Sequence, residues 1–167
     1  MPRVIIPEVI EPDEALPADL VALRHFARLM DEALPIPGTN RRVGLDAGLG
    51  LIPGVGDAIA AILSTWIVIG ALRHRVPLRR VARMLFNILI DLGLGSIPVV
   101  GDVFDFFYEE NVMNLQLLLK HRDRSQPPRT FAQIALAAAT IVGIVLLFAF
   151  FVLAAIVAGI FYLIGKR

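Results

Sequence analysis

Two stretches of the chain decide its fold: LDAGLGLIPGVGDAIAAIL at Leu45–Leu63 and IDLGLGSIPVVGDVFDFFY at Ile90–Tyr108. They lie 45 positions apart, and nine of the thirteen positions from Leu45–Asp57 are identical in Ile90–Asp102. Identity of this extent in so short a window indicates an internal repeat. Each copy has a Gly-rich apolar arm, a break at a proline and a second apolar arm. This pattern predicts two copies of one helix-turn-helix unit.

The composition around the repeat is strongly apolar. The chain has 167 residues, of which 57% are hydrophobic, and its mean hydropathy is +0.73. This exceeds the value for ordinary soluble domains and indicates contact with lipid. The chain has no cysteine, which excludes disulfides and thiolate sites. Its three histidines lack metal-ligand spacing, so we expect no metal and no cofactor.

The segment before the repeat divides into two parts. Residues 1–17 carry a proline at every fifth position from Pro2, which is typical of an extended arm and lacks the pattern of a secretory signal. Residues 18–40 are expected to form an amphipathic helix and a linker. The helix should cover Ala18–Leu34, where apolar residues recur every three or four positions, and end at Pro35.

The duplicated hairpin domain is expected to occupy residues 41–121. Its first copy should contain a short helix, a break at Pro53, and a second helix that Asp57 caps. Its second copy should repeat this order, with the helix after the break beginning behind Asp102. The expected helices are Arg42–Ile52, Ala58–Arg73, Leu78–Gly95 and Val103–His121.

A polar linker, 122–130, precedes a long apolar segment. Phe131–Ile164 contains 34 residues and no charge. As a helix it would measure about 51 Å, against about 30 Å for a bilayer core. We therefore predict a transmembrane helix over 131–165. One long tilted helix is favoured over a hairpin, because Ile144–Phe151 has no turn-forming residue.

Basic residues flank the open ends of both hairpins, at Arg41–Arg42, Arg73–Arg83 and Lys120–Arg129. Basic groups gathered at one level are typical of the cytoplasmic side of a membrane. The favoured fold class is an all-α membrane protein, with a duplicated helix-turn-helix hairpin core and a C-terminal transmembrane helix. It would lie in a bacterial inner membrane, with the basic loops and the N-terminal region cytoplasmic. The alternative is a soluble four-helix bundle tethered by that helix.

Aspartates flank both turns. Asp57 and Asp102 fall at helix starts, where carboxylates accept backbone N–H bonds. Asp46 and Asp91 fall inside apolar helices, where a charge requires a partner. Two interpretations stay open: a hydrogen-bonded network that fixes helix packing, and a cation or proton site at broken helix ends. The candidate residues are Asp46, Asp57, Arg83, Asn87, Asp91, Asp102 and Asp105.

Glycines are frequent in both copies. Small residues on one helix face let helix backbones approach closely, within a chain or between chains. The candidate packing positions are Gly48, Gly50, Gly54, Gly93 and Gly95.

A set of residues in both repeat copies and the helix that follows them forms a recognisable pattern: Leu45-Asp46, Gly50–Asp57, Arg83-Met84, Asn87, Ile90-Asp91, Gly95, Ile97–Asp102, Phe104-Asp105, Asn111 and Asn114-Leu115. By this pattern the segment from about Gly44 to His121 resembles an uncharacterised bacterial and fungal family, domain of unknown function 4112. The resemblance implies a helical, membrane-associated protein without an assigned activity.

The sequence contains no nucleophile with a neighbouring base and no metal-binding set. We therefore expect a non-catalytic protein, a structural or accessory subunit that contacts lipid and packs in a membrane complex or a homo-oligomer. The second hypothesis is an ion- or proton-translocating homo-oligomer that uses the paired aspartates. No segment is basic enough to predict binding of nucleic acid.

Overall fold

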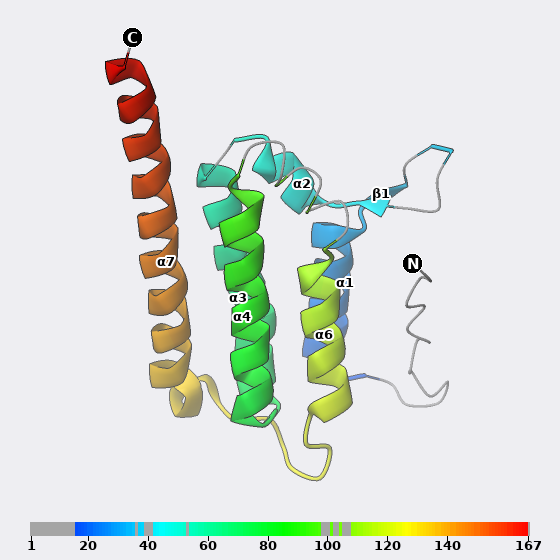
Figure 1. The fold of residues 1–167 in the computed structure, drawn as a ribbon. Helices are drawn as coiled ribbons and strands as arrows, with labels where there is room; N and C mark the ends of the chain where they lie inside the picture. The colour runs from blue at the N-terminus through cyan, green and yellow to red at the C-terminus, as the bar shows by residue number, and fades with distance from the viewer. Residues whose placement is uncertain are drawn as a thin grey trace.

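The computed structural model describes residues 16–35, 37–38, 42–52, 54–97, 101, 104 and 108–166 (Figure 1). Over these residues the chain is mainly helical, as predicted. The one sheet among them is a short antiparallel pair, β1 (Leu34–Pro35) and β2 (Arg42–Val43). The helices are α1 (Ala18–Asp31), α2 (Leu45–Gly50), α3 (Val55–Arg73), α4 (Leu78–Gly95), α6 (Glu110–His121) and α7 (Phe131–Gly165).

Helix α3 is the centre of the molecule. It contacts α1, α2, α4, α6 and α7. Its sequence is consistent with this central position, because a helix without a polar face buries most of its surface against neighbouring helices or lipid. Helices α1 and α6 pack together on one side of the α3–α4 pair, and α7 stands on the other side (Figure 1).

Helix α1 has the predicted amphipathic face, and its Leu20, Leu23, Ala27 and Met30 are buried. The helix ends at Asp31, three residues before the predicted end at Leu34. The chain turns there into β1, which pairs with β2, and Leu34 is exposed. Pairing between segments eight residues apart overrides the local helical pattern.

The two repeat turns share their backbone hydrogen bonds. Ile52 N donates to Leu49 O at 3.0 Å, and Gly56 N donates to Ile52 O at 2.8 Å. At the positions 45 residues later, Ile97 N donates to Leu94 O at 3.1 Å, and Gly101 N donates to Ile97 O at 2.6 Å.

The arms that flank the turns differ from the prediction. The first arm, α2, has six residues, whereas α4 has 18, so the expected helix over Arg42–Ile52 is wrong in its extent. Its first residues form β2 instead. Helix α3 begins at Val55 rather than Ala58. The predicted start of the last arm at Val103 lies outside the described residues, and α6 begins at Glu110.

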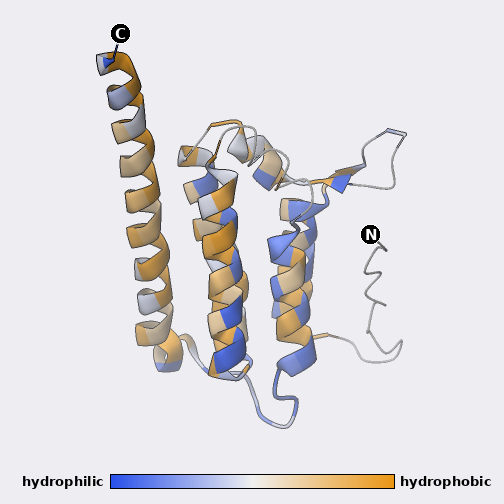
Figure 2. Ribbon diagram, viewed as in Figure 1, coloured by the Kyte–Doolittle hydropathy of each residue, from blue (hydrophilic) through white to orange (hydrophobic). Residues whose placement is uncertain are grey.

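Helix α7 is one continuous helix of 35 residues, which confirms the preference for a single helix over a hairpin. Thr130 caps its start, where Thr130 and Gln133 exchange hydrogen bonds between side chain and backbone. One stripe of α7 is buried, made of Ile134, Ile141, Val145 and Ala149, and its other sides are exposed and apolar (Figure 2). Within the described residues, α3 and α7 are long and apolar enough to cross a membrane.

Candidate functional site: a buried polar cluster

Acids and amides lie in the interior between α1, α4 and α6. Asp31 is 4% exposed, Glu110 is 1% exposed, and Asn111 and Asn114 are fully buried. Asn87 of α4 is also buried. Buried groups of this kind are destabilising unless other groups satisfy their hydrogen bonds. We call these five residues the polar cluster.

Asp31 joins the end of α1 to the start of α6. Its Oδ1 accepts a hydrogen bond from Asn111 Nδ2 at 2.8 Å, and its Oδ2 accepts one from Val112 N at 2.8 Å. Val112 lies in the first turn of α6, where backbone N–H groups have no partner inside the helix. The carboxyl of Asp31 therefore caps α6 from a helix 80 residues earlier in the chain.

Asn114 is the junction of the cluster. Its Nδ2 donates to Glu110 Oε2 at 2.7 Å and to Met84 O at 3.2 Å, while its Oδ1 accepts from Asn87 Nδ2 at 2.8 Å. One side chain thus ties α6 to both the backbone and a side chain of α4. Asn111 Oδ1 is buried without a hydrogen-bond partner among the described residues.

Burial sets the protonation of the cluster. Removal from water raises the pKa of Glu110 to about 8, which repulsion from Asp46 reinforces and a hydrogen bond with Ser64 opposes. Burial, with repulsion from Glu110 and Asp46, also raises the pKa of Asp31 well above its usual range. Burial raises the pKa of Asp46 to about 6. Near neutral pH Glu110 therefore holds its proton, because a charged carboxylate is poorly stabilised in an interior with little water and with another acid nearby.

The model of the family described as "Domain of unknown function (DUF4112)" matches residues 19–122. The chain belongs to this family. The DUF4112 domain starts at the first residues of α1, and so includes a helix that the sequence resemblance from Gly44 onward left out. The matched residues include all five members of the polar cluster, whereas α7 lies beyond the matched range. No curated protein and no solved structure matches the chain.

Few of the predicted site residues enter the polar cluster of the DUF4112 domain. Asn87 is a member, and Asp46 acts on the cluster through its charge. Arg83 is exposed on α4. Asp91 is partly exposed and, with Arg83, lies close enough to influence the pKa of Tyr108, which burial raises to about 12. Asp102 and Asp105 lie outside the described residues.

Asp57 has a local role in the first turn. Its Oδ2 accepts a hydrogen bond from Gly54 N at 2.8 Å. Asp57 is the third residue of α3, so this contact satisfies the backbone at the helix start.

The candidate glycines divide by environment. A Cβ at Gly54 would lie 2.8 Å from Ile156 of α7, and one at Gly93 would lie 3.6 Å from Phe148 of α7. Gly56 lies close to the backbone of Gly50, and Gly101 lies close to the backbone of Gly95. A Cβ at Gly48 would meet no atom within 4 Å, so any packing role of Gly48 would have to lie between chains.

Four members of the cluster, Asp31, Glu110, Asn111 and Asn114, are absent from the site residues predicted from the sequence. A signal for Glu110 exists in the sequence of α6. Glu110, Asn111 and Asn114 share a helix face with the buried Leu115 and Leu118. An acid and two amides in phase with buried leucines indicate an interior polar network rather than a solvated face. Asp31 gives no such signal, because one acid near a helix end resembles an exposed residue.

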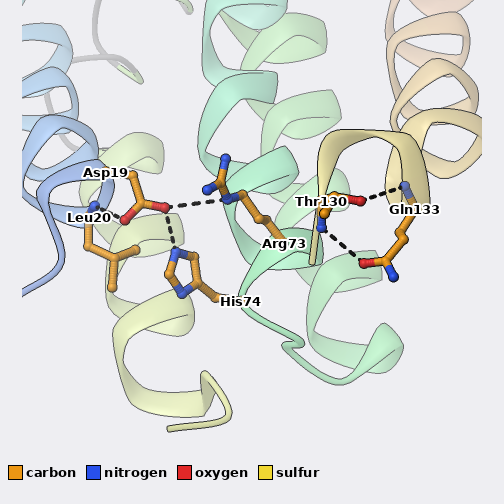
Figure 3. A network of polar contacts seen from close by, with 6 residues as sticks. All are labelled: Asp19, Leu20, Arg73, His74, Thr130 and Gln133. Atoms are coloured by element: carbon orange, nitrogen blue, oxygen red, sulfur yellow. Dashed lines mark hydrogen bonds and ion pairs between the residues drawn. The ribbon is translucent and has the colours of Figure 1, made fainter. Parts of the chain in front are cut away.

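A second set of polar contacts lies at the opposite end of the bundle (Figure 3). Asp19 Oδ2 of α1 is 2.8 Å from His74 Nε2 and 3.5 Å from Arg73 Nε, both at the end of α3. Burial alone would raise the pKa of Asp19, but the hydrogen bond and charge of His74, together with the charge of Arg73, lower it. No group of acids or histidines in the described part of the chain has metal-binding geometry.

Because the polar cluster raises the pKa of Glu110, we predict that the folded protein becomes less stable as the pH rises. The folded chain raises the pKa of Glu110 from 4.5 to about 8, so it binds this proton more tightly than the unfolded chain does. The stabilisation by this proton is full below about pH 4.5 and is lost toward pH 8, with a slope of at most about 1.4 kcal/mol per pH unit. Asp31 and Asp46 act in the same direction.

Thermal unfolding of the detergent-solubilised protein between pH 5 and 8 measures this slope. In Glu110→Gln, the neutral amide can still accept the hydrogen bond from Asn114. The melting temperature of this variant should therefore depend less on pH than that of the native chain. Parallel curves for the two proteins would contradict a buried proton on Glu110.

Proposed function

We propose that the protein is a non-catalytic membrane protein, in which α7 is the anchor and the DUF4112 domain is a structural or accessory subunit of a membrane complex. The observation that carries this proposal is that α7 is uncharged and mostly exposed. No charged residue occurs between Phe131 and Gly165, and only 17% of the most apolar stretch of α7 is buried against the rest of the chain.

The length of α7 supports a membrane anchor over a helix of a soluble bundle. Its 35 residues extend about 52 Å, which exceeds the roughly 30 Å of a bilayer core. Large apolar side chains are exposed around it, among them Leu136 at 83% and Phe161 at 70%. An apolar surface of this extent would cause aggregation in water and is stable in lipid.

Helix α3 adds a second apolar surface. Ile59, Ile62, Leu63 and Trp66 follow one face of α3 and are each more than a third exposed. The ring of Phe26 on α1 packs edge-on against Trp66, with centroids 4.9 Å apart. Because α7 packs along α3, a bilayer around α7 would also reach this face, so the domain would lie against the membrane rather than away from it.

The contacts of the acids favour a packing role over translocation. Asp57 caps α3, Asp31 of α1 binds the amide of Asn111 on α6, and Glu110 accepts a hydrogen bond from Asn114 one turn later on its own helix. Asn114 in turn binds Asn87 and Met84 O of α4, so these contacts hold α1, α4 and α6 together. An accessory subunit needs such a defined domain and an apolar surface for its partners, and we propose that the exposed faces of α3 and α7 supply that surface.

Two measurements on the full chain test the proposal. The protein should stay with membranes during alkaline carbonate extraction, whereas a larger fraction of Leu147→Arg, on the exposed side of α7, should be extracted, because a central arginine disfavours insertion by roughly 3 kcal/mol. Leu147→Ala is the matched control and should stay. Particles extracted in mild detergent should contain other chains in fixed proportion.

Each result has a definite meaning. Release of the native chain by carbonate would overturn the membrane assignment. A particle made of this chain alone would contradict the accessory role and turn attention to translocation by a homo-oligomer.

A further inference from the structure

Basic residues gather at one end of the bundle, which we call the basic end. The end of α3, the start of α4, the end of α6 and the start of α7 all lie there, and hydrophilic residues are concentrated at the helix ends (Figures 1 and 2). Its lysine and arginine residues are Arg73, Arg75, Arg79, Arg80, Lys120, Arg122, Arg124 and Arg129. The acids among the described residues at this end are Asp19 and Asp123, so positive charge predominates.

Hydrogen bonds hold these charges at one level. The linker before α7 is tied to the end of α3, since Asp123 N donates to His74 O at 3.0 Å and Arg129 N donates to Arg73 O at 2.8 Å. Arg75 Nε also donates to Pro127 O at 3.2 Å. The basic residues at the end of α3 and in the linker are therefore held at one level relative to the start of α7.

The acids of the basic end are already engaged. Asp19 pairs with His74 and Arg73, and Asp123 Oδ1 accepts hydrogen bonds from the backbone and the hydroxyl of Ser125. On α4, by contrast, Arg79 is exposed, and the buried Nε of Arg80 has no hydrogen-bond acceptor within the described part of the chain. The first turn of α4 thus places two arginines at this end, the exposed Arg79 and the partly buried Arg80, whose buried Nε is an unsatisfied donor.

The basic end also coincides with the start of the apolar surface. The guanidinium of Arg73 lies 4.7 Å from the ring centroid of Phe131, the first residue of α7, and that ring is exposed. Trp66 lies seven residues before Arg73 on the same face of α3, about 10 Å farther from the basic end. Arginine beside aromatic residues at the start of an apolar helix is typical of the boundary between lipid headgroups and chains.

We propose that the basic end binds the headgroups of anionic phospholipids in the leaflet at which α7 begins. The proposal rests on α7 being a membrane anchor, since only then does this end meet headgroups. Phosphate is the matching ligand, because guanidinium groups donate paired hydrogen bonds to its oxygens. A cavity of about 260 Å³ lies at the same end and gives a headgroup room to enter; Arg122, Arg124 and His74 line it together with Asp123, whose carboxylate already accepts hydrogen bonds from Ser125.

Titration of the full-length protein in a nonionic detergent tests the proposal. The probes are dioctanoyl phosphatidylglycerol and dioctanoyl phosphatidylcholine, with bound lipid counted by native mass spectrometry. The anionic lipid should bind more tightly, and added salt should weaken it. Each arginine near a membrane surface contributes about fivefold to such binding, so Arg79→Gln with Arg80→Gln should weaken it roughly thirtyfold.

The matched control is Arg79→Lys with Arg80→Lys, which keeps both charges and should retain most of the preference for phosphatidylglycerol. Inorganic phosphate at millimolar concentration should not displace the lipid; displacement would assign the site to free phosphate and overturn the lipid proposal. Equal binding of the two lipids would also overturn it. Neither of these results would affect carbonate resistance, so failure here is distinguishable from failure of the membrane anchor.

Discussion

Replacing Gly56 by alanine is expected to destabilise the folded chain by about 3 kcal/mol or more. A Cβ at this position would lie 1.7 Å from Leu49 O, which is backbone and cannot move aside as a side chain could. The turn of the first repeat would have to open, with loss of the bond from Gly56 N to Ile52 O. Chemical or thermal unfolding in detergent measures the loss, as a lower midpoint or as failure to fold.

Gly48→Ala is the matched control, eight residues away. A Cβ there meets no atom within 4 Å, and Gly48 lies in α2. Alanine in a helix is more stable than glycine by up to about 1 kcal/mol, so this variant should be as stable as the native chain or slightly more stable. Gly101→Ala, in the second turn, should behave like Gly56→Ala, because its Cβ would lie 1.9 Å from Gly95 O. Equal effects of Gly48→Ala and Gly56→Ala would contradict the close approach at the turn.

Asn114→Ala is expected to destabilise the chain by about 3 to 5 kcal/mol. The change removes three hydrogen bonds and leaves Glu110, Asn87 Nδ2 and Met84 O buried without this partner. Groups left unsatisfied in the interior are more destabilising than the loss of the bonds themselves. Unfolding at pH 6, where Glu110 holds its proton, measures the change without a new buried charge.

Two comparisons show whether the polar cluster acts as a unit. Gln116→Ala, partly exposed on the same helix, should change stability by less than about 0.5 kcal/mol. Asn87→Ala combined with Asn114→Ala should be less destabilising than the sum of the two single changes, because each removes the partner of the other. Additive losses would mean that the two amides stabilise the bundle independently.

Local patterns in the sequence predicted the helices whose formation depends on the spacing of apolar residues within one segment. The spacing of Leu20, Leu23, Ala27 and Met30 gave the buried face of α1, and the charge-free run from Phe131 gave α7 as one helix. The repeat predicted two turns, and these share their hydrogen bonds because the residues that make them are the same. The short first arm was not foreseen, since pairing between β1 and β2 uses residues that look compatible with a helix.

The candidate site was only partly predictable, because its contacts join distant segments. Arg83, Asn87 and Asp91, three of the predicted candidates, follow one another at intervals of four residues and so share one face of α4. Helix packing buries Asn87 alone of the three, and its partner Asn114 lies 27 residues later. A pattern on one helix shows which side chains share a face, and the identity of the facing helix depends on the tertiary fold.

The contact between Asp31 and Val112 also has a consequence for how the protein is made. The carboxyl finds its backbone partner 81 residues further on, so α1 leaves the ribosome long before α6 can complete its contacts. During that interval α1 exposes its apolar face and exists as an isolated helix, which is marginally stable in water. The fold can close only when the chain has been synthesised through α6. The nascent N-terminal half would therefore expose apolar surface to proteases and to aggregation until α6 is synthesised.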